Sequence, residues 1–130
     1  MRIGAIGIDS SHTPVFTNRI NAMHKEGKTA CKVAAFWDPG RHEWQHPAGP
    51  EQSAKDVAQW RADTVKEGAE EAKSLDDLLA RVDGVMVLNI SGHRHLELAA
   101  AAISKGMPTY VDKPLTCDFE QAMTLLKLTR

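Results

Sequence analysis

The stretch Val85-Met86-Val87-Leu88-Asn89-Ile90 is the strongest indication of the fold in this sequence of 130 residues. It is an almost unbroken apolar run, and Ser91 and Gly92 follow it. Strands of a parallel sheet have this composition when helices cover both faces, because both sides of each strand are then buried. The run therefore predicts a central strand over Gly84–Ile90.

On either side of this run, short apolar segments alternate with longer segments of helical spacing. The other predicted strands are Arg2–Ile8, Lys32–Trp37 and Thr109–Val111. The predicted helices are 13–25, Ser53–Glu67, Leu75–Arg81, His95–Gly106 and Asp118–Leu128. The proline- and glycine-containing segment Pro39–Pro50 is predicted to be a long surface loop. This alternation indicates an α/β fold, a doubly wound parallel sheet in three α/β/α layers, Rossmann-like, with one domain over residues 1–130.

Composition excludes several classes of partner. The formal net charge is −1, so no basic field draws the chain to nucleic acid or to a membrane surface. No apolar run reaches the roughly 18 residues of a membrane span, and we expect a cytoplasmic protein. Cys31 and Cys117 are expected to be buried free thiols. The histidines at 42, 46, 93 and 95 lack acidic or cysteine partners at suitable spacing, so no metal site is predicted.

The first strand-to-helix turn, Gly7-Ile8-Asp9-Ser10-Ser11-His12, stands where a doubly wound sheet binds its ligand. The N-terminus of the following helix would offer free N–H groups and a positive dipole end to a phosphate. A dinucleotide turn of the form Gly-x-Gly-x-x-Gly has glycine at the places of Asp9 and His12. A phosphate turn with altered chemistry and an ordinary strand-to-helix corner both remain open.

The carboxylate of Asp9 would repel a phosphate unless it turned back to cap the N–H of Ser11 or Thr13. The hydroxyls of Ser10, Ser11 and Thr13 are candidate donors in place of the missing glycines. The chemistry of the turn therefore depends on where the Asp9 carboxylate points.

Asp38 ends the second predicted strand, where an acidic side chain can accept hydrogen bonds from the adenosine ribose. That role would favour NAD over NADP, because the carboxylate would repel a 2′-phosphate, and Arg41 would soften the preference. The alternative is a loop aspartate that starts a turn before Pro39.

Two later stretches, 83–99 and 105–116, complete a pattern of parts. Together with the segments above, they resemble the N-terminal domain of the Gfo/Idh/MocA oxidoreductases, the family of glucose–fructose oxidoreductase and inositol dehydrogenase, from Arg2 to Arg130. That family has a Thr-Pro-type turn after a strand, a histidine opening an alanine-rich helix, then Gly-x-x-Val and Glu-Lys-Pro. The corresponding parts here are Ile90-Ser91, His95, Gly106–Val111 and Asp112-Lys113-Pro114.

The resemblance implies an NAD(P)-dependent oxidoreductase acting on a sugar, polyol or related hydroxylated substrate. Lys113 would lie beside the nicotinamide and the substrate, where it would position the hydroxyl and assist proton transfer. Asp112 takes the place of the family's glutamate, and Pro114 would fix the turn through a Lys-Pro bond that is often cis in the family. Asn89, Ser91 and His95 are the further cofactor contacts that the resemblance implies.

The resemblance also implies a second domain with most of the substrate contacts, which this chain does not include. We therefore expect little or no catalysis from the chain alone, and a monomer, because family oligomers form mostly through that domain. A second hypothesis is a Rossmann-like module that binds another small anion or serves as an interaction domain. Asp9 and His12 favour this second hypothesis, whereas Asp38 and Asp112-Lys113-Pro114 favour the first.

Overall fold

Five parallel strands form the sheet in the computed structural model, which describes residues 1–129. The strand order is β3-β2-β1-β4-β5, so the chain starts in the middle and winds outward in both directions. The strands are β1 (Arg2–Ile6), β2 (Lys32–Trp37), β3 (Glu70–Glu71), β4 (Gly84–Val87) and β5 (Thr109–Val111).

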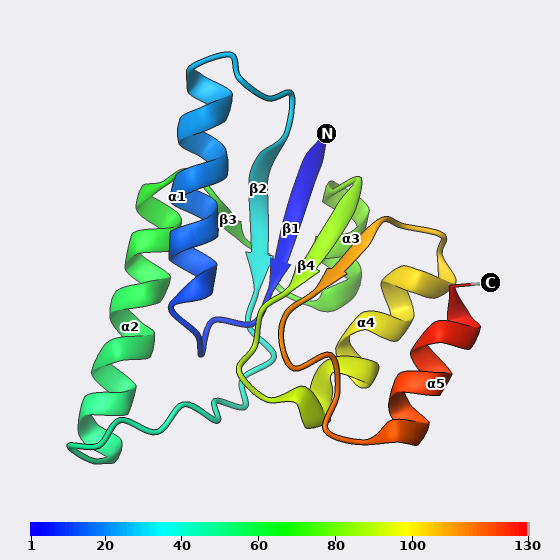
Figure 1. Cartoon of the computed structure of the whole chain (residues 1–130). Helices are drawn as coiled ribbons and strands as arrows, with labels where there is room; N and C mark the ends of the chain where they lie inside the picture. Colours follow the sequence, from blue (N-terminus) through cyan, green and yellow to red (C-terminus); the bar gives the residue numbers. More distant parts are fainter. Residues whose placement is uncertain (130) are drawn as a thin grey trace.

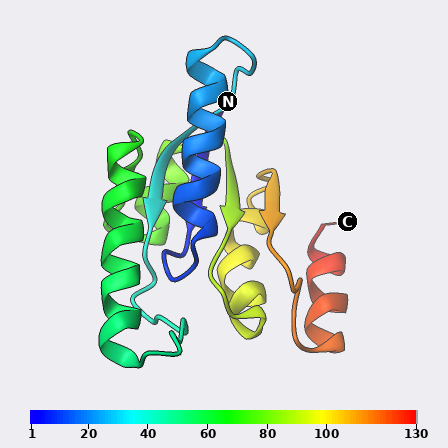
Figure 2. The same cartoon turned by 60° about the vertical axis from the view of Figure 1, so that its left-hand side comes forward.

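Helices cover both faces of this sheet. They are α1 (His12–Lys25), α2 (Pro50–Lys66), α3 (Leu75–Arg81), α4 (His95–Ser104) and α5 (Phe119–Leu128), and the short 3₁₀ helix η1 (Gly92–Arg94) leads into α4. Helices α1 and α2 lie on one face, and α3, α4 and α5 lie on the other (Figures 1 and 2). The predicted doubly wound α/β/α architecture is confirmed.

The core divides into two clusters, one on each face of the sheet. Successive residues of β4 and its extension alternate between them: Val85 and Val87 pack on the α4 side, Met86 and Leu88 on the α1 side. All four residues of β4 are buried. This two-sided burial is the reason that the strand is apolar throughout, as the sequence indicated.

Both central strands end earlier than predicted, at Ile6 instead of Ile8 and at Val87 instead of Ile90. The last contact between them is the hydrogen bond from the Leu88 N–H to the Ile6 carbonyl, 2.8 Å. Beyond it Gly7 takes a φ of 99°, which turns the chain out of the sheet. A Cβ at Gly7 would lie 2.6 Å from the backbone nitrogen of Asn89, so the turn needs a glycine there.

The edge strand β3 was not predicted. Its two residues, Glu70 and Glu71, are exposed and acidic, so no apolar pattern marks them; charge at a sheet edge discourages pairing with another chain. Helix α2 begins at Pro50, three residues before the predicted start, because proline is well tolerated in the first turn. Ser74 caps the start of α3 by accepting from the Asp77 N–H, and Asp118 caps the start of α5 by accepting from the Gln121 N–H.

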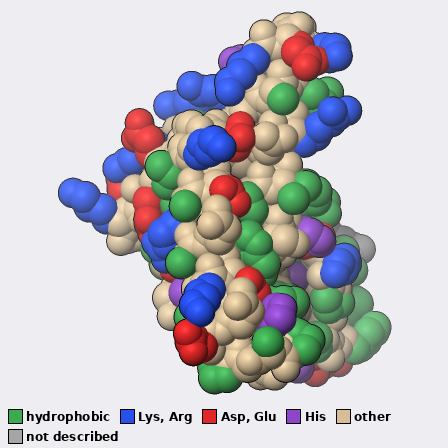
Figure 3. Space-filling model, turned by 90° about the vertical axis from the view of Figure 1, so that its left-hand side faces the viewer, with side chains coloured by type: hydrophobic (Ala, Val, Ile, Leu, Met, Phe, Trp, Pro, Cys, Tyr) green, Lys and Arg blue, Asp and Glu red, His purple; other side chains and the backbone are tan. Residues whose placement is uncertain are grey.

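The outer surface carries mixed charge. On the face formed by α1 and α2, basic and acidic side chains alternate with exposed hydrophobic ones (Figure 3). Both cysteines are free, as expected, but Cys31 is only half-buried and Cys117 is exposed, so their predicted burial was wrong. Among residues 1–129, no helix has the length and apolar character that crossing a bilayer requires.

Candidate functional site

The residues predicted as site residues gather at one edge of the sheet. They follow β1 (residues 7–12), β2 (residue 38), β4 (residues 89–91) and β5 (residues 112–114). Because all strands are parallel, these four connections leave the sheet at the same edge, which is where open α/β sheets bind ligands. His95 is close behind them, at the start of α4.

Inside the first turn, the hydroxyls of Ser10 and Thr13 form local hydrogen bonds. The Ser10 hydroxyl accepts from the His12 N–H at 3.1 Å, and the Ser10 carbonyl accepts from the Thr13 N–H at 3.3 Å. The Thr13 hydroxyl donates to the Gly7 carbonyl at 2.9 Å. The hydroxyls of Ser10 and Thr13 therefore stabilise the turn itself, while Ser11 is exposed.

Asp9 does not cap Ser11 or Thr13. Its side chain turns away from α1, and its oxygens accept from the Glu43 N–H at 2.9 Å and from the Ile90 N–H at 3.3 Å. The residue is only 2% exposed. The carboxylate thus joins the connections that follow β1, β2 and β4.

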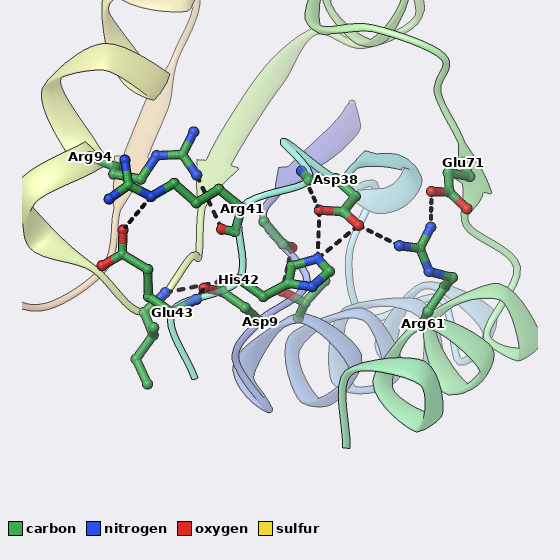
Figure 4. Close-up of polar contacts among 12 residues, drawn as sticks. Asp9, Asp38, Arg41, His42, Glu43, Arg61, Glu71 and Arg94 are labelled. Carbon is green, nitrogen blue, oxygen red and sulfur yellow. Dashed lines mark hydrogen bonds and ion pairs between the residues drawn. The ribbon is translucent and has the colours of Figure 1, made fainter. Parts of the chain in front are cut away.

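Asp38 lies where predicted, but its carboxylate is already paired. It accepts from the Gly40 N–H at 2.8 Å, contacts Nε2 of His42 at 3.0 Å and forms an ion pair with Arg61 (Figure 4). Burial by itself would raise the pKa of Asp38, but the hydrogen bonds from Gly40 and His42 and the charges of His42 and Arg61 outweigh it and lower that pKa. Asp38 is therefore an anion at neutral pH.

The sequence suggested Arg41 as the basic residue near Asp38, but the basic residues that contact Asp38 are His42 and Arg61. Arg41 points away from Asp38, is largely exposed and pairs with Glu43 at 3.4 Å. Arg61 approaches from α2 and also contacts Glu71 (Figure 4). His42 stands four residues after Asp38, a spacing that the sequence does show, whereas nothing local links Arg61 to Asp38.

Asp112 and His12 form a pair that connects the ends of β5 and β1. Nδ1 of His12 contacts Oδ2 of Asp112, and the Tyr110 hydroxyl donates to Oδ1 of Asp112 at 3.2 Å. Burial acts to raise the pKa of Asp112, but the hydrogen bond from His12 and the Lys113 N–H outweigh it, so that pKa is lowered. The His12 ring also packs on Phe16, with ring centres 5.4 Å apart.

Lys113 lies at the mouth of a pocket beside this pair. The pocket has a volume of about 180 Å³ and is lined by Ser10, Ser11, His12, Trp44, Trp60, Ile90, Asp112 and Lys113. The Lys113–Pro114 bond is cis, as the resemblance implied. Sequence reasoning missed the two tryptophans: Trp44 packs against Trp60, and its Nε1–H donates to Asp56 at 2.8 Å.

His95 and Asn89 hold the connections together from inside. The His95 ring is fully buried; Nδ1 faces the Pro114 carbonyl at 2.8 Å and Nε2 faces the Asn89 carbonyl at 3.0 Å. The Asn89 amide donates to the Ser91 carbonyl at 3.0 Å, while its buried Oδ1 has no hydrogen-bond partner within residues 1–129. A buried acceptor of this kind is available to a donor from a ligand or water. Ile8 is also fully buried, in the core, so its side chain is closed off from any ligand.

The chain can now be compared with known proteins. The model of an oxidoreductase family with an NAD-binding Rossmann fold matches residues 1–130. A search of curated protein sequences gave no significant match. No group of three or more potential metal-ligating side chains occurs within the described part of the chain.

Solved structures of similar fold are longer enzymes. UDP-N-acetylglucosamine 3-dehydrogenase GnnA from Acidithiobacillus ferrooxidans is 25% identical, with a TM-score of 0.62, over 98% of this chain and 33% of its own. A 3-ketoreductase from Actinomadura kijaniata, solved with NADP and TDP-benzene, is 25% identical, with a TM-score of 0.64, over 100% and 34%. The WlbA dehydrogenase from Bordetella pertussis, solved with NADH and UDP-GlcNAcA, is 20% identical, with a TM-score of 0.66, over 99% and 34%. The chain thus spans about a third of the length of these structures.

Proposed function

Because the chain belongs to the Gfo/Idh/MocA oxidoreductase family and forms its NAD-binding Rossmann domain, we propose that it is the cofactor-binding part of an NAD(P)-dependent dehydrogenase. The substrate class that we propose is a sugar, polyol or related hydroxylated compound. The name of GnnA, a dehydrogenase of a nucleotide-linked sugar, supports this class.

One observation carries the proposal: Lys113 and the His12–Asp112 pair line the same pocket at the carboxyl edge of the sheet. A lysine and a histidine can each hold or release a proton, and a carboxylate that contacts one ring nitrogen orients the ring. This combination suits a hydroxyl group that must lose or gain a proton.

A nicotinamide cofactor, when bound, would supply hydride transfer. The residues of this chain provide the rest of the chemistry. Lys113 positions the substrate hydroxyl and assists its proton transfer, and Asp112 keeps its negative charge at neutral pH because its pKa is lowered. Trp44 and Trp60 give the pocket part of its apolar lining.

For the cofactor we propose NAD, with NADP as a weaker alternative. The anionic Asp38 lies just after β2. There it would accept hydrogen bonds from the ribose hydroxyls and repel a 2′-phosphate. Arg61 and His42 soften that repulsion, because both contact the same carboxylate. The 3-ketoreductase was solved with NADP and the WlbA dehydrogenase with NADH, so both cofactors occur among similar structures.

Calorimetric titration of the chain with NADH and with NADPH tests the proposal. We expect binding of both, tighter for NADH, and an Asp38→Ala variant that loses more affinity for NADH than for NADPH. Asp76→Ala, at an exposed position of α3, is the matched control for the loss of one charge. If neither the folded chain nor its Asp9→Gly variant binds either cofactor at about millimolar concentration, the proposal is refuted; equal losses in Asp38→Ala refute the role of Asp38.

A small-anion site is the second candidate function, and the size of the pocket favours it. Its 180 Å³ is below the roughly 300–1,000 Å³ of most ligand sites, while Lys113, His12 and Ser11 offer donors. Titration with inorganic phosphate alongside NADH separates the two candidates: saturable phosphate binding without NADH binding favours the small anion.

A further inference from the structure

The Asp9 carboxylate occupies the place where a dinucleotide-binding turn would approach its diphosphate. It follows β1 at the position of the second glycine of such a turn, and it is 2% exposed. Both of its hydrogen bonds come from backbone N–H groups of other connections, Glu43 at 2.9 Å and Ile90 at 3.3 Å. Backbone N–H groups at this edge are what a diphosphate would use.

Two of the first three N–H groups of α1 are already bonded and the third is missing, so the exposed Ser11 is the donor residue that remains at this helix start. The N–H groups of His12 and Thr13 are taken by the Ser10 hydroxyl and carbonyl, and Pro14 has none. A diphosphate placed here would face the buried Asp9 carboxylate, while the N–H groups of His12 and Thr13 are bonded to Ser10. In this conformation the turn therefore does not fit the cofactor.

The connection 39–49 closes the same edge from outside, and Asp9 is one of its attachments. Arg94 donates to the Arg41 carbonyl at 3.2 Å (Figure 4), and the Ser53 hydroxyl accepts from the His46 N–H at 2.8 Å. Trp44, in the middle of this segment, lines both the 180 Å³ pocket beside Lys113 and a second pocket of about 440 Å³ beside α2. Trp44 thus lies between the pocket at the strand ends and the pocket beside α2.

We propose that Asp9 is an internal anion that competes with the diphosphate of the cofactor and so sets the affinity of the domain for dinucleotides. The proposal rests on the proposed cofactor-binding function. When Asp9 holds the N–H groups of Glu43 and Ile90, the segment 39–49 lies across the strand ends and Trp44 separates the two pockets. When Asp9 leaves them, the two N–H groups become free for the ligand's phosphates and the segment is attached by fewer contacts.

The test uses two variants, Asp9→Gly and Asp9→Asn, and two measurements. Calorimetry gives the dissociation constants for NADH and NADPH, and hydrogen exchange reports on the amides of Glu43 and Ile90. We expect Asp9→Gly to bind NADH about tenfold or more tightly than the wild type, because two hydrogen bonds to a charged group are removed from the competition. Asp9→Asn should gain less, because its carbonyl can keep one bond. Both amides should exchange faster in Asp9→Gly, and in Asp9→Asn the amide that loses its acceptor should exchange faster.

Asp76→Asn on α3 is the control for net charge, and it should change neither measurement. If Asp9→Gly does not fold, Asp9→Asn carries the test with the same expected direction. A wild type that binds NADH as tightly as both variants overturns the role of Asp9 and leaves the proposed function intact. A complete lack of NADH binding in the wild type and both variants overturns both.

Discussion

The acidic side chains that follow β1 and β2 have different partners from the one that follows β5. We call these the β1–β2 side and the β5 side of the strand ends. Asp9 and Asp38, after β1 and β2, are paired with backbone N–H groups and with Arg61, and both fasten segments of the chain. Asp112, after β5, contacts a histidine ring that lines a pocket with Lys113. Similar acidic side chains therefore serve architecture on one side and a candidate proton-transfer group on the other. Asp38 also contacts a histidine ring, that of His42, so the difference comes from the other partners: Arg61 and the Gly40 N–H for Asp38, and a pocket shared with Lys113 for Asp112.

Gly7, which follows β1, lies against the backbone of Asn89, which follows β4. We expect the largest loss of stability from a substitution at this contact. Gly7→Ala would force a Cβ to within 2.6 Å of the Asn89 backbone and place alanine at a φ of 99°. We expect a loss of about 3 kcal/mol in the free energy of unfolding, measured by urea denaturation. Gly27→Ala, at a φ of 70° with nothing within 4 Å of the new Cβ, is the control and should lose about 1 kcal/mol. Equal losses would show that the close approach to Asn89 has no energetic weight.

The architectural role of Asp38 can be tested by Asp38→Asn. The substitution removes the charge that Arg61 and His42 contact and weakens the bond from the Gly40 N–H, so we expect a loss of about 2 kcal/mol in the free energy of unfolding. Asp76→Asn should change it by less than about 0.5 kcal/mol. A neutral result for Asp38→Asn would contradict a structural role for the ion pair.

Acid should remove the stabilisation that Asp38 and Asp112 each contribute to the folded chain. The folded pKa values of Asp38 and Asp112 are lowered, so the stabilisation is present above their unfolded pKa of 3.8 and is lost as the pH falls through the lower folded values. Stability should therefore fall below about pH 4, measured by thermal unfolding between pH 7 and pH 2. The double variant Asp38→Asn, Asp112→Asn should show a flatter profile; an unchanged slope would exclude these two groups as its cause.

The β5 side should tolerate substitution better. Asp112→Asn keeps an acceptor for the Tyr110 hydroxyl and loses only the charge opposite a partly exposed His12, so we expect a loss of about 1 kcal/mol. Lys113→Ala, at an exposed position, should change stability by less than about 0.5 kcal/mol. Urea denaturation measures both. A loss for Lys113→Ala as large as that for Asp38→Asn would remove the contrast between the two sides.

The sequence predicted which positions along the chain would reach the site. Gly7, Asp38 and Lys113 each follow a strand that the apolar pattern revealed, and parallel strands bring such positions to one edge. The direction of the Asp9 side chain was not predictable, because its partner Ile90 is 81 residues away. Likewise Trp44 and Trp60 line the pocket only because the irregular segment after β2 folds back onto α2.

The sequence by itself determined the alternation of strands and helices, the two-sided burial of β4 and the helix caps, because each of these leaves a periodic or local signal in neighbouring residues. The tertiary structure decided which groups meet: His12 with Asp112, 100 residues apart, and Arg61 with Asp38, 23 residues apart. Such pairs depend on strand order and on the packing of α2 against the sheet, neither of which is written in any single segment. For the turn after β1, the sequence showed that glycines were replaced, and the structure showed that the replacing carboxylate is bound by the chain's own backbone.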